Sequence, residues 1–138
     1  MSEAGYRVTH LDDIPEPAGE KEEGERNWHT VRIHFGITSF GINAYTANQE
    51  GPILGEHDES DTNHEELFFV SEGSATFTID GETVEAPAGT FVYVPDPAAI
   101  RSAVAREPRT TLVCLGGVPG EAYAVSAWEQ KYDPASSE

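Results

Sequence analysis

The chain has one cysteine, few basic residues and no long apolar run. A single cysteine, Cys114 in "TTLVCLGG", excludes an internal disulfide framework, and it is interpreted as a small buried side chain on a strand. No apolar run approaches the roughly 18 residues that cross a membrane. The start "MSEAGYRVTH" lacks the basic and apolar regions of a secretory signal. These absences predict a protein of the reducing cytoplasm.

Positive charge is scarce: 8 basic side chains stand against 25 acidic ones, which gives a formal net charge of −17. Such a charge repels nucleic-acid phosphates and anionic lipids, and no basic patch opposes it. We therefore expect neither nucleic acid nor a membrane as a partner. The acidity is interpreted as a source of solubility rather than as a substrate-binding feature.

The length of 138 residues suits a single domain. Residues 1–27 are rich in Glu, Pro and Gly and are interpreted as an irregular acidic N-terminal arm, although "YRVTHL" is also compatible with an edge strand. Residues 28–118 carry the β-like pattern. Residues 119–138 are expected to be a C-terminal tail, in which "PGEAYAVSAWEQKY" is compatible with a short helical turn or a strand.

Short runs rich in Val, Ile, Thr, Phe and Tyr, separated by Gly, Pro, Asp and Asn, predict an all-β domain that is closed or sandwiched. The runs are "WHTVRIHF", "TSFGINAYTA", "ELFFVSE", "SATFTID", "ETVEA", "TFVYVP", "SAVA" and "TTLVCLGG". "TIDGET" predicts a tight hairpin, because Asp80 and Gly81 accept positive φ. "APAGTF" predicts a second turn at the permissive Gly89.

The stretch "GEHDESDTNHEELFFVSEG" holds two histidines and several acidic residues. If residues 60–63 close a four-residue hairpin, His57 lies opposite Glu66 and Glu59 opposite His64, with all four side chains on one face and Cβ separations of about 5 Å. Two imidazoles and two carboxylates suit Zn, Fe, Mn or Ni better than Ca or Mg. The alternative is a solvated acidic loop whose histidines merely point outward.

These residues, followed by "ELFFVSEG" and "APAGTFVYVPDP", resemble the cupin superfamily of small β-barrels over about residues 28–118. The family's first motif is matched at its opening and its close, and its second motif at its start. The matches are Gly51-x5-His57, Glu66-x6-Gly73 and Gly89-x5-Pro95. The resemblance implies a jelly-roll β-barrel (a double-stranded β-helix) and, in most members, a metal held by three histidines and one glutamate.

The sequence departs from the cupin pattern at the ligands. Glu59 replaces the second histidine, and Ile100 stands where the second motif has its metal-binding histidine. The usual three-histidine, one-glutamate site therefore cannot form. Either His57, His64 and Glu66 hold an ion, with Glu59 as a fourth ligand or an orienting neighbour, or the barrel has lost its metal and kept only the pocket.

Four further residues are candidates for ligand binding. Asn43 and Tyr45 share a strand face, where they would offer a polar group and an aromatic wall, or else form a surface Asn beside a half-buried Tyr. Phe68 is expected to line the barrel below the acid, although core packing explains it equally well. Arg101 either crosses the mouth or solvates the rim, and the rim is the favoured interpretation.

The resemblance and the residues together predict a cupin that binds a small organic molecule, with a divalent metal (Fe, Zn, Mn or Ni) held atypically. Glu66 and Glu59 are the candidate catalytic groups, moving protons beside an ion that acts as a Lewis acid or binds O2 in oxygenation, isomerisation or a metabolite-tailoring step. One alternative is a non-catalytic binding or sensing module, and another is a structural interaction partner. Small cupins often pair through edge strands, which predicts a homodimer.

Overall fold

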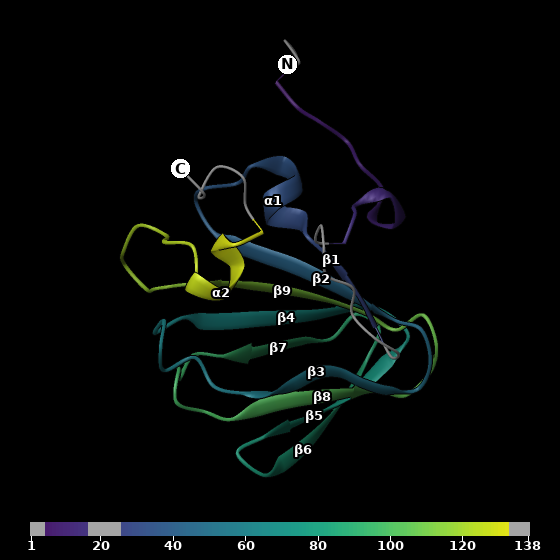
Figure 1. The fold of residues 1–138 in the computed structure, drawn as a ribbon. Helices are drawn as coiled ribbons and strands as arrows, with labels where there is room; N and C mark the ends of the chain where they lie inside the picture. Colours follow the sequence, from purple (N-terminus) through teal and green to yellow (C-terminus); the bar gives the residue numbers. More distant parts are fainter. Residues whose placement is uncertain (1–4, 17–25, 133–138) are drawn as a thin grey trace.

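The computed structural model describes residues 5–16 and 26–132, which form two antiparallel sheets stacked face to face (Figure 1). One sheet has five strands in the order β1-β2-β9-β4-β7, and the other has four in the order β3-β8-β5-β6. The strands are β1 (Arg26–His29), β2 (Gly41–Ala47), β3 (Gly51–His57), β4 (Glu65–Glu72), β5 (Ser74–Ile79), β6 (Glu82–Pro87), β7 (Phe91–Val94), β8 (Arg101–Ala105) and β9 (Thr111–Gly117). The predicted all-β jelly-roll class is confirmed.

Three short helical segments accompany the sheets: a 3-10 turn (Leu11–Asp13), α1 (Val31–Phe35) and α2 (Ala127–Gln130). The prediction that "WHTVRIHF" forms one strand is correct only for its first residues, because β1 ends at His29 and the helix α1 follows. Gly36, at a φ of 70°, ends α1. Within the described ranges, no helix is long and apolar enough to cross a bilayer.

Both predicted turns are confirmed. Asp80 and Gly81 have φ values of 50° and 85° and join β5 to β6, which pair along their whole length. Gly89 has a φ of 95° between β6 and β7. Local residue chemistry therefore identified these connections correctly, because only a few residue types accept positive φ.

Strand β3 ("GPILGEH") is missing from the predicted strand runs. It pairs with β8, with its register interrupted at two points between Pro52 and His57. Proline is tolerated there because β3 is an edge strand of its sheet. This strand carries His57 to one end of the barrel.

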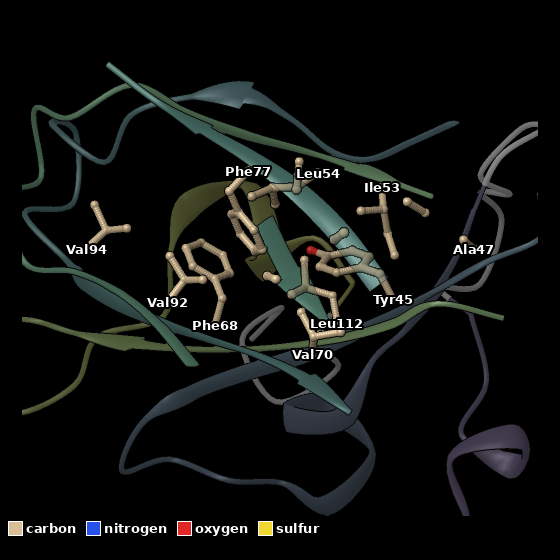
Figure 2. Close-up of a cluster of buried hydrophobic side chains, with 14 of the residues drawn as sticks. Tyr45, Ala47, Ile53, Leu54, Phe68, Val70, Phe77, Val92, Val94 and Leu112 are labelled. Carbon is tan, nitrogen blue, oxygen red and sulfur yellow. The ribbon is translucent and has the colours of Figure 1, made fainter. Parts of the chain in front are cut away.

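The core lies between the inner faces of the two sheets (Figure 2). Phe68 from β4 and Phe77 from β5 are fully buried, with ring centroids 5.5 Å apart. Ile53, Val70 and Leu112 complete this centre, and each is fully buried. Alternate residues on facing strands thus supply the apolar filling that holds the two sheets together.

Across the five-stranded sheet, the paired inward residues change from apolar to polar. Tyr45, Leu112 and Val70 share one row, and Asn43, Cys114 and Phe68 share the next. The third row holds two glycines and a carboxylate, at Gly41, Gly116 and Glu66. The barrel is therefore filled at one end and left open and polar at the other.

Candidate functional site

A cavity of about 320 Å³ occupies the polar end of the barrel. Its walls come from both sheets, from the loop between β3 and β4, and from the segment after β9. Such a volume lies at the lower end of cavities that hold small organic molecules. The cavity therefore lies at the end of the barrel that holds the residues predicted from the sequence to form the site.

Two glycines make room at this end. A Cβ on Gly41 would lie 2.8 Å from the hydroxyl oxygen of Tyr123, and a Cβ on Gly116 would lie 3.2 Å from the Glu65 carbonyl oxygen. Both positions sit in the row of Glu66, so larger residues there would fill the space beside its carboxylate. The missing side chains leave space for Tyr123 and the cavity.

The loop between β3 and β4 crosses from one sheet to the other. The predicted hairpin is wrong, because β3 pairs with β8 whereas β4 pairs with β7 and β9. A tight turn replaces it: the backbone N–H groups of Thr62 and Asn63 donate to the Glu59 carbonyl, at 3.1 and 2.7 Å. Asn63 has a φ of 58°, which asparagine tolerates better than most residues.

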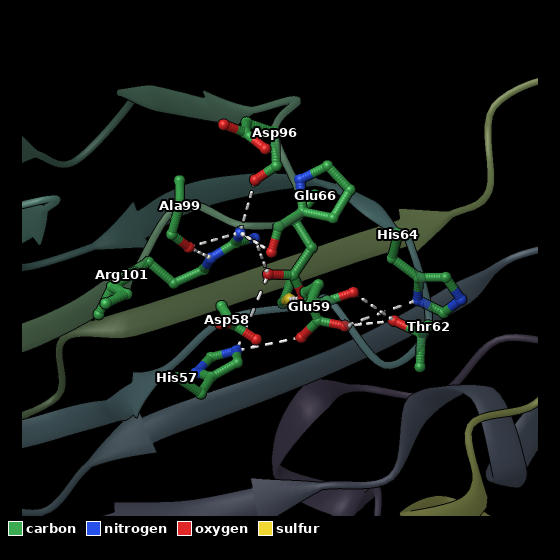
Figure 3. A network of polar contacts seen from close by, with 12 residues as sticks. His57, Asp58, Glu59, Thr62, His64, Glu66, Asp96, Ala99 and Arg101 are labelled. Atoms are coloured by element: carbon green, nitrogen blue, oxygen red, sulfur yellow. Dashed lines mark hydrogen bonds and ion pairs between the residues drawn. The ribbon is translucent and has the colours of Figure 1, made fainter.

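The four predicted side chains nevertheless lie together (Figure 3). His57 Nε2 lies 3.1 Å from Glu59 Oε2 and 3.9 Å from Glu66 Oε1. The Thr62 hydroxyl donates to Glu59 Oε1 at 2.8 Å, and His64 Nδ1 is 4.0 Å from the same oxygen. Glu59 is thus the centre of the cluster, between the two histidines.

Arg101 is buried, so the expectation that it solvates the rim is wrong. Its guanidinium is 0% exposed and donates from Nη1 to Glu66 Oε1 at 2.8 Å. Nη2 donates to the carbonyl oxygens of Asp96 and Ala99, at 2.9 and 2.8 Å. The preceding Ile100 is 46% exposed, so Arg101 is the residue of this segment that points inward.

The surroundings of the cluster shift its pKa values in different directions. The hydrogen bond with Glu59 raises the pKa of His57 above its usual 6.5. Burial alone would raise the pKa of Glu59, but hydrogen bonds from His57 and Thr62 outweigh it and hold that pKa below 4.5. Burial, reinforced by the charge of Glu59, raises the pKa of Glu66 despite Arg101.

Cys114 is a protonated neighbour of Glu66 rather than a nucleophile. Its Sγ donates to Glu66 Oε2 at 3.4 Å. Burial, together with the charge of Glu66, raises the pKa of the thiol well above its usual value. A thiol held protonated lacks the thiolate that nucleophilic attack requires.

The four predicted ligand-binding residues separate into two pairs. Asn43 and Tyr45 line the cavity. Phe68 and Arg101 do not, since Phe68 is packed in the apolar centre and Arg101 lies behind Glu66. Asn43 is 7% exposed, and its Oδ1 is buried without a hydrogen-bond partner.

The segment after β9, expected to be a tail, supplies part of the cavity wall through Tyr123, Ser126, Trp128 and Glu129. Glu129 forms an ion pair of 2.7 Å with Arg32, and both side chains are almost fully buried. The Tyr123 ring lies 5.8 Å from that of His64. No local pattern could reveal these contacts, because Arg32 and Glu129 are 97 residues apart.

The donor atoms suit a divalent ion in type and spacing. Among the described residues, one atom each from His57, Glu59 and Glu66 lies within 4.8 Å of the others. One imidazole nitrogen and two carboxylate oxygens match the preferences of Zn, Fe, Mn and Ni. His64, placed in the ligand set by sequence, lies outside this group, and Glu59 takes its place.

Residues 50–98 match the cupin domain family. A sugar phosphate isomerase of the cupin superfamily from Silicibacter pomeroyi has a similar structure, with a TM-score of 0.61 and 18% identity over 82% of this chain and 77% of that one. Ectoine synthase from P. lautus gives a TM-score of 0.59 and 16% identity, over 90% and 83%.

A nucleoside dehydratase from Streptomyces is also similar, with a TM-score of 0.57 and 14% identity over 91% of this chain and 88% of that one. At these identities the likeness concerns the fold alone. Among curated proteins, none matches the chain significantly.

Proposed function

The chain is a small member of the cupin superfamily, and from this premise we propose that it binds a small polar molecule in the barrel and changes it by proton transfer. The observation that carries the proposal is the 3.1 Å contact between His57 Nε2 and Glu59, beside Glu66 in the wall of one cavity. General acid–base catalysis needs a proton donor and a proton acceptor within reach of the same bound molecule.

The two carboxylates suit opposite roles. Glu59, with a lowered pKa, is the proton acceptor, and it works together with the imidazole of His57. Glu66, with a raised pKa, is the group that more readily holds a proton. Carboxylates whose pKa values are shifted apart are a recurring arrangement in acid–base enzymes.

Arg101 is proposed to position the carboxylate of Glu66. Its guanidinium fixes one carboxylate oxygen by a 2.8 Å hydrogen bond, while Cys114 contacts the other oxygen. The carboxyl group is thereby oriented from behind and presents one edge to the cavity. This is a positioning role, because Arg101 itself does not line the cavity.

The names of the structural relatives are compatible with such chemistry. One is a sugar phosphate isomerase and another a nucleoside dehydratase. Isomerisation and dehydration both require that protons be moved on a small substrate. At 14–18% identity these names show only that the fold can host such reactions, and the proposal for this chain is carried by its own residues.

The proposal includes a divalent ion as the alternative occupant of this cluster, since a carboxylate that binds an ion gives up its proton. His57, Glu59 and Glu66 would hold it, and when bound it would supply Lewis-acid character to a ligand oxygen. Arg101 would keep Glu66 in position through its hydrogen bond to Oε1. Zn, Fe, Mn and Ni are the candidates that the donor types allow.

The test of the proposed function is consumption of a small molecule. Wild-type protein is incubated with a pool of small polar metabolites, and the pool is followed by mass spectrometry. At least one component should disappear as a product forms, and the rate should fall at least tenfold with Glu59→Gln or His57→Gln. A pool left unchanged, or consumed equally by both variants, would contradict the proposal.

The second candidate function is non-catalytic binding or sensing. It is favoured by the second motif, where Ile100 cannot bind a metal and Arg101 brings a fixed charge instead. In that case a ligand binds without turnover, and His57→Ala leaves its affinity nearly unchanged. Loss of both ligand and metal in His57→Ala would exclude this candidate.

The proposal also includes a cytoplasmic homodimer. β7 is an edge strand of its sheet, and its Phe91 and Tyr93 are 63% and 57% exposed, with Phe91 stacked on Phe69 at 4.5 Å. Exposed apolar side chains on a sheet edge favour pairing with a second copy. Light scattering should give the mass of a dimer, and Phe91→Glu should give the mass of a monomer.

A further inference from the structure

Among the described residues that line the cavity, Asn43 is the one with a buried side-chain polar atom that lacks a hydrogen-bond partner. Asn43 Oδ1 is buried and accepts no hydrogen bond, although the side chain as a whole is only 7% exposed. Asn43 lies within β2, with its backbone paired to Cys114 of β9, so the side chain has little freedom to turn outward. A buried acceptor left unpaired is unfavourable, and a ligand that donates to it would satisfy it.

Three carboxylates of the wall, Glu59, Glu66 and Glu129, by contrast, already have partners. Glu59 contacts His57 at 3.1 Å, and Glu66 contacts Arg101 at 2.8 Å. On the opposite wall, Glu129 contacts Arg32 at 2.7 Å. Every one of these three inner carboxylates is therefore matched by a basic side chain of the protein itself.

Arg26 is the arginine among the described residues that line the cavity, and it is engaged with the protein. Its Nη1 donates to the Ile53 carbonyl at 2.7 Å, and its guanidinium lies 4.2 Å from the centroid of the Tyr45 ring. A carboxylate or phosphate in the cavity would also lie near Glu59 and Glu66. The wall thus offers an anion little attraction, and it offers a neutral donor an unused acceptor.

We propose that the natural ligand of this cavity is uncharged and donates an N–H or O–H hydrogen bond to Asn43 Oδ1. The inference rests on the proposed function only in taking the cavity as the ligand site. Trp128, which lines the cavity and is 50% exposed, gives a flat apolar surface that suits a ring. The ligand class is therefore a neutral cyclic molecule with an amide-like or hydroxyl donor.

Matched amides and carboxylates test this inference. Benzamide and benzoate, and likewise nicotinamide and nicotinate, have nearly the same shape, but only the amides are uncharged N–H donors. Their dissociation constants are measured by chemical-shift titration of ¹⁵N-labelled protein. Each amide should bind at least tenfold more tightly than its carboxylate, a difference of about 1.4 kcal/mol, and should shift the side-chain amide signal of Asn43.

Variants of Asn43 show whether this residue accepts the hydrogen bond that the ligand donates. Asn43→Leu, which keeps the approximate shape, should abolish the preference for amides. Asn43→Asp keeps an acceptor oxygen and should retain the preference for amides. It is the control for a folding defect caused by substitution at this position in the leucine variant. Asn48→Leu alters an exposed asparagine just beyond β2 and should behave as wild type.

The inference is overturned if the carboxylates bind as tightly as the amides, if Asn43→Leu keeps the preference, or if no amide binds at about 10 mM, ten times a dissociation constant of about 1 mM. Failure of the proposed function looks different. It appears as a metabolite pool left unchanged by wild-type protein, whereas the preference for amides is measured by binding and does not require turnover.

Discussion

Arg101 Nη1 donates a 2.8 Å hydrogen bond to Glu66 Oε1 across the barrel, from β8 in one sheet to β4 in the other. The arginine is fully buried and the carboxylate nearly so. A buried ion pair costs desolvation energy, and it is kept where its geometry is satisfied by further hydrogen bonds. Here those bonds come from the carbonyl oxygens of Asp96 and Ala99. The pair fixes the orientation of the Glu66 carboxylate in the cavity wall and places a positive charge behind it.

Removing one partner should destabilise the protein strongly. Arg101→Leu leaves Glu66 buried without its cation, and the free energy of unfolding should fall by about 3–5 kcal/mol. Urea denaturation measures this loss. The double variant Arg101→Leu/Glu66→Gln should recover much of it, because the unpaired charge is gone. Arg106→Leu, at an exposed position, should change stability by no more than about 0.5 kcal/mol. Equal losses in the two arginine variants would contradict the role of the pair.

The pKa of His57 should depend on Glu59. In Glu59→Gln the imidazole loses its main partner, so the pKa of His57 should fall, as NMR titration in chelator-containing buffer would show. Because that pKa is raised on folding, the stabilisation from His57 is fully present below pH 6.5 and is lost as the pH rises through the folded-state value. Glu65→Gln, which removes a carboxylate bonded to Tyr93, should leave the titration unchanged. An unchanged pKa in Glu59→Gln would exclude the pairing.

Divalent ions should stabilise the protein through His57, Glu59 and Glu66. Addition of Zn, Mn, Fe or Ni should raise the melting temperature, since an ion at 100 times its dissociation constant adds about 2.7 kcal/mol of stability. His57→Ala and Glu59→Gln should abolish the effect, whereas His64→Ala should retain most of it because His64 lies outside the compact group. If unsupplemented protein contains no ion and none of the four raises the melting temperature, the metal part of the proposal is wrong.

Two glycines with similar backbone angles should tolerate alanine differently. Gly73 and Gly81 have φ values of +76° and +85°, but a Cβ on Gly73 would lie 2.6 Å from Thr110 Cα, whereas Gly81 has open space. Gly81→Ala should cost about 1–2 kcal/mol from the backbone alone. Gly73→Ala adds a clash with backbone and should cost at least about 1–3 kcal/mol more. Chemical denaturation of the two variants would show this gap, and equal losses would contradict the packing around Gly73.

The fold was predictable because its signals are local. Alternation of side chains and the positive-φ residues Asp80 and Gly81 identified strands and turns without any knowledge of distant contacts. The partner of a strand is not a local property, and that is why His57 and Glu66 were assigned to one hairpin although β3 and β4 lie in different sheets. The two residues still meet, because the short connection returns the chain to the same end of the barrel.

The wall of the cavity was less predictable. The orientation of Arg101 depends on where β8 begins after an irregular segment, which residue alternation cannot fix. Trp128 lies in α2, which is held by contacts of Glu129 with Arg32 and of Trp128 with Trp28, and Tyr123 lies in the segment just before this helix. Such contacts between the two ends of the chain leave no pattern in the sequence.

The most direct test of proton transfer at His57 and Glu59 is deuterium incorporation. Wild-type protein and the Glu59→Gln variant are incubated in D2O with the metabolite pool, and the products are examined by mass spectrometry. The account predicts a product that carries solvent deuterium on carbon, or has lost water, with wild type and at least tenfold more slowly with Glu59→Gln. A product formed without deuterium uptake or loss of water, or formed equally fast by the variant, would contradict it.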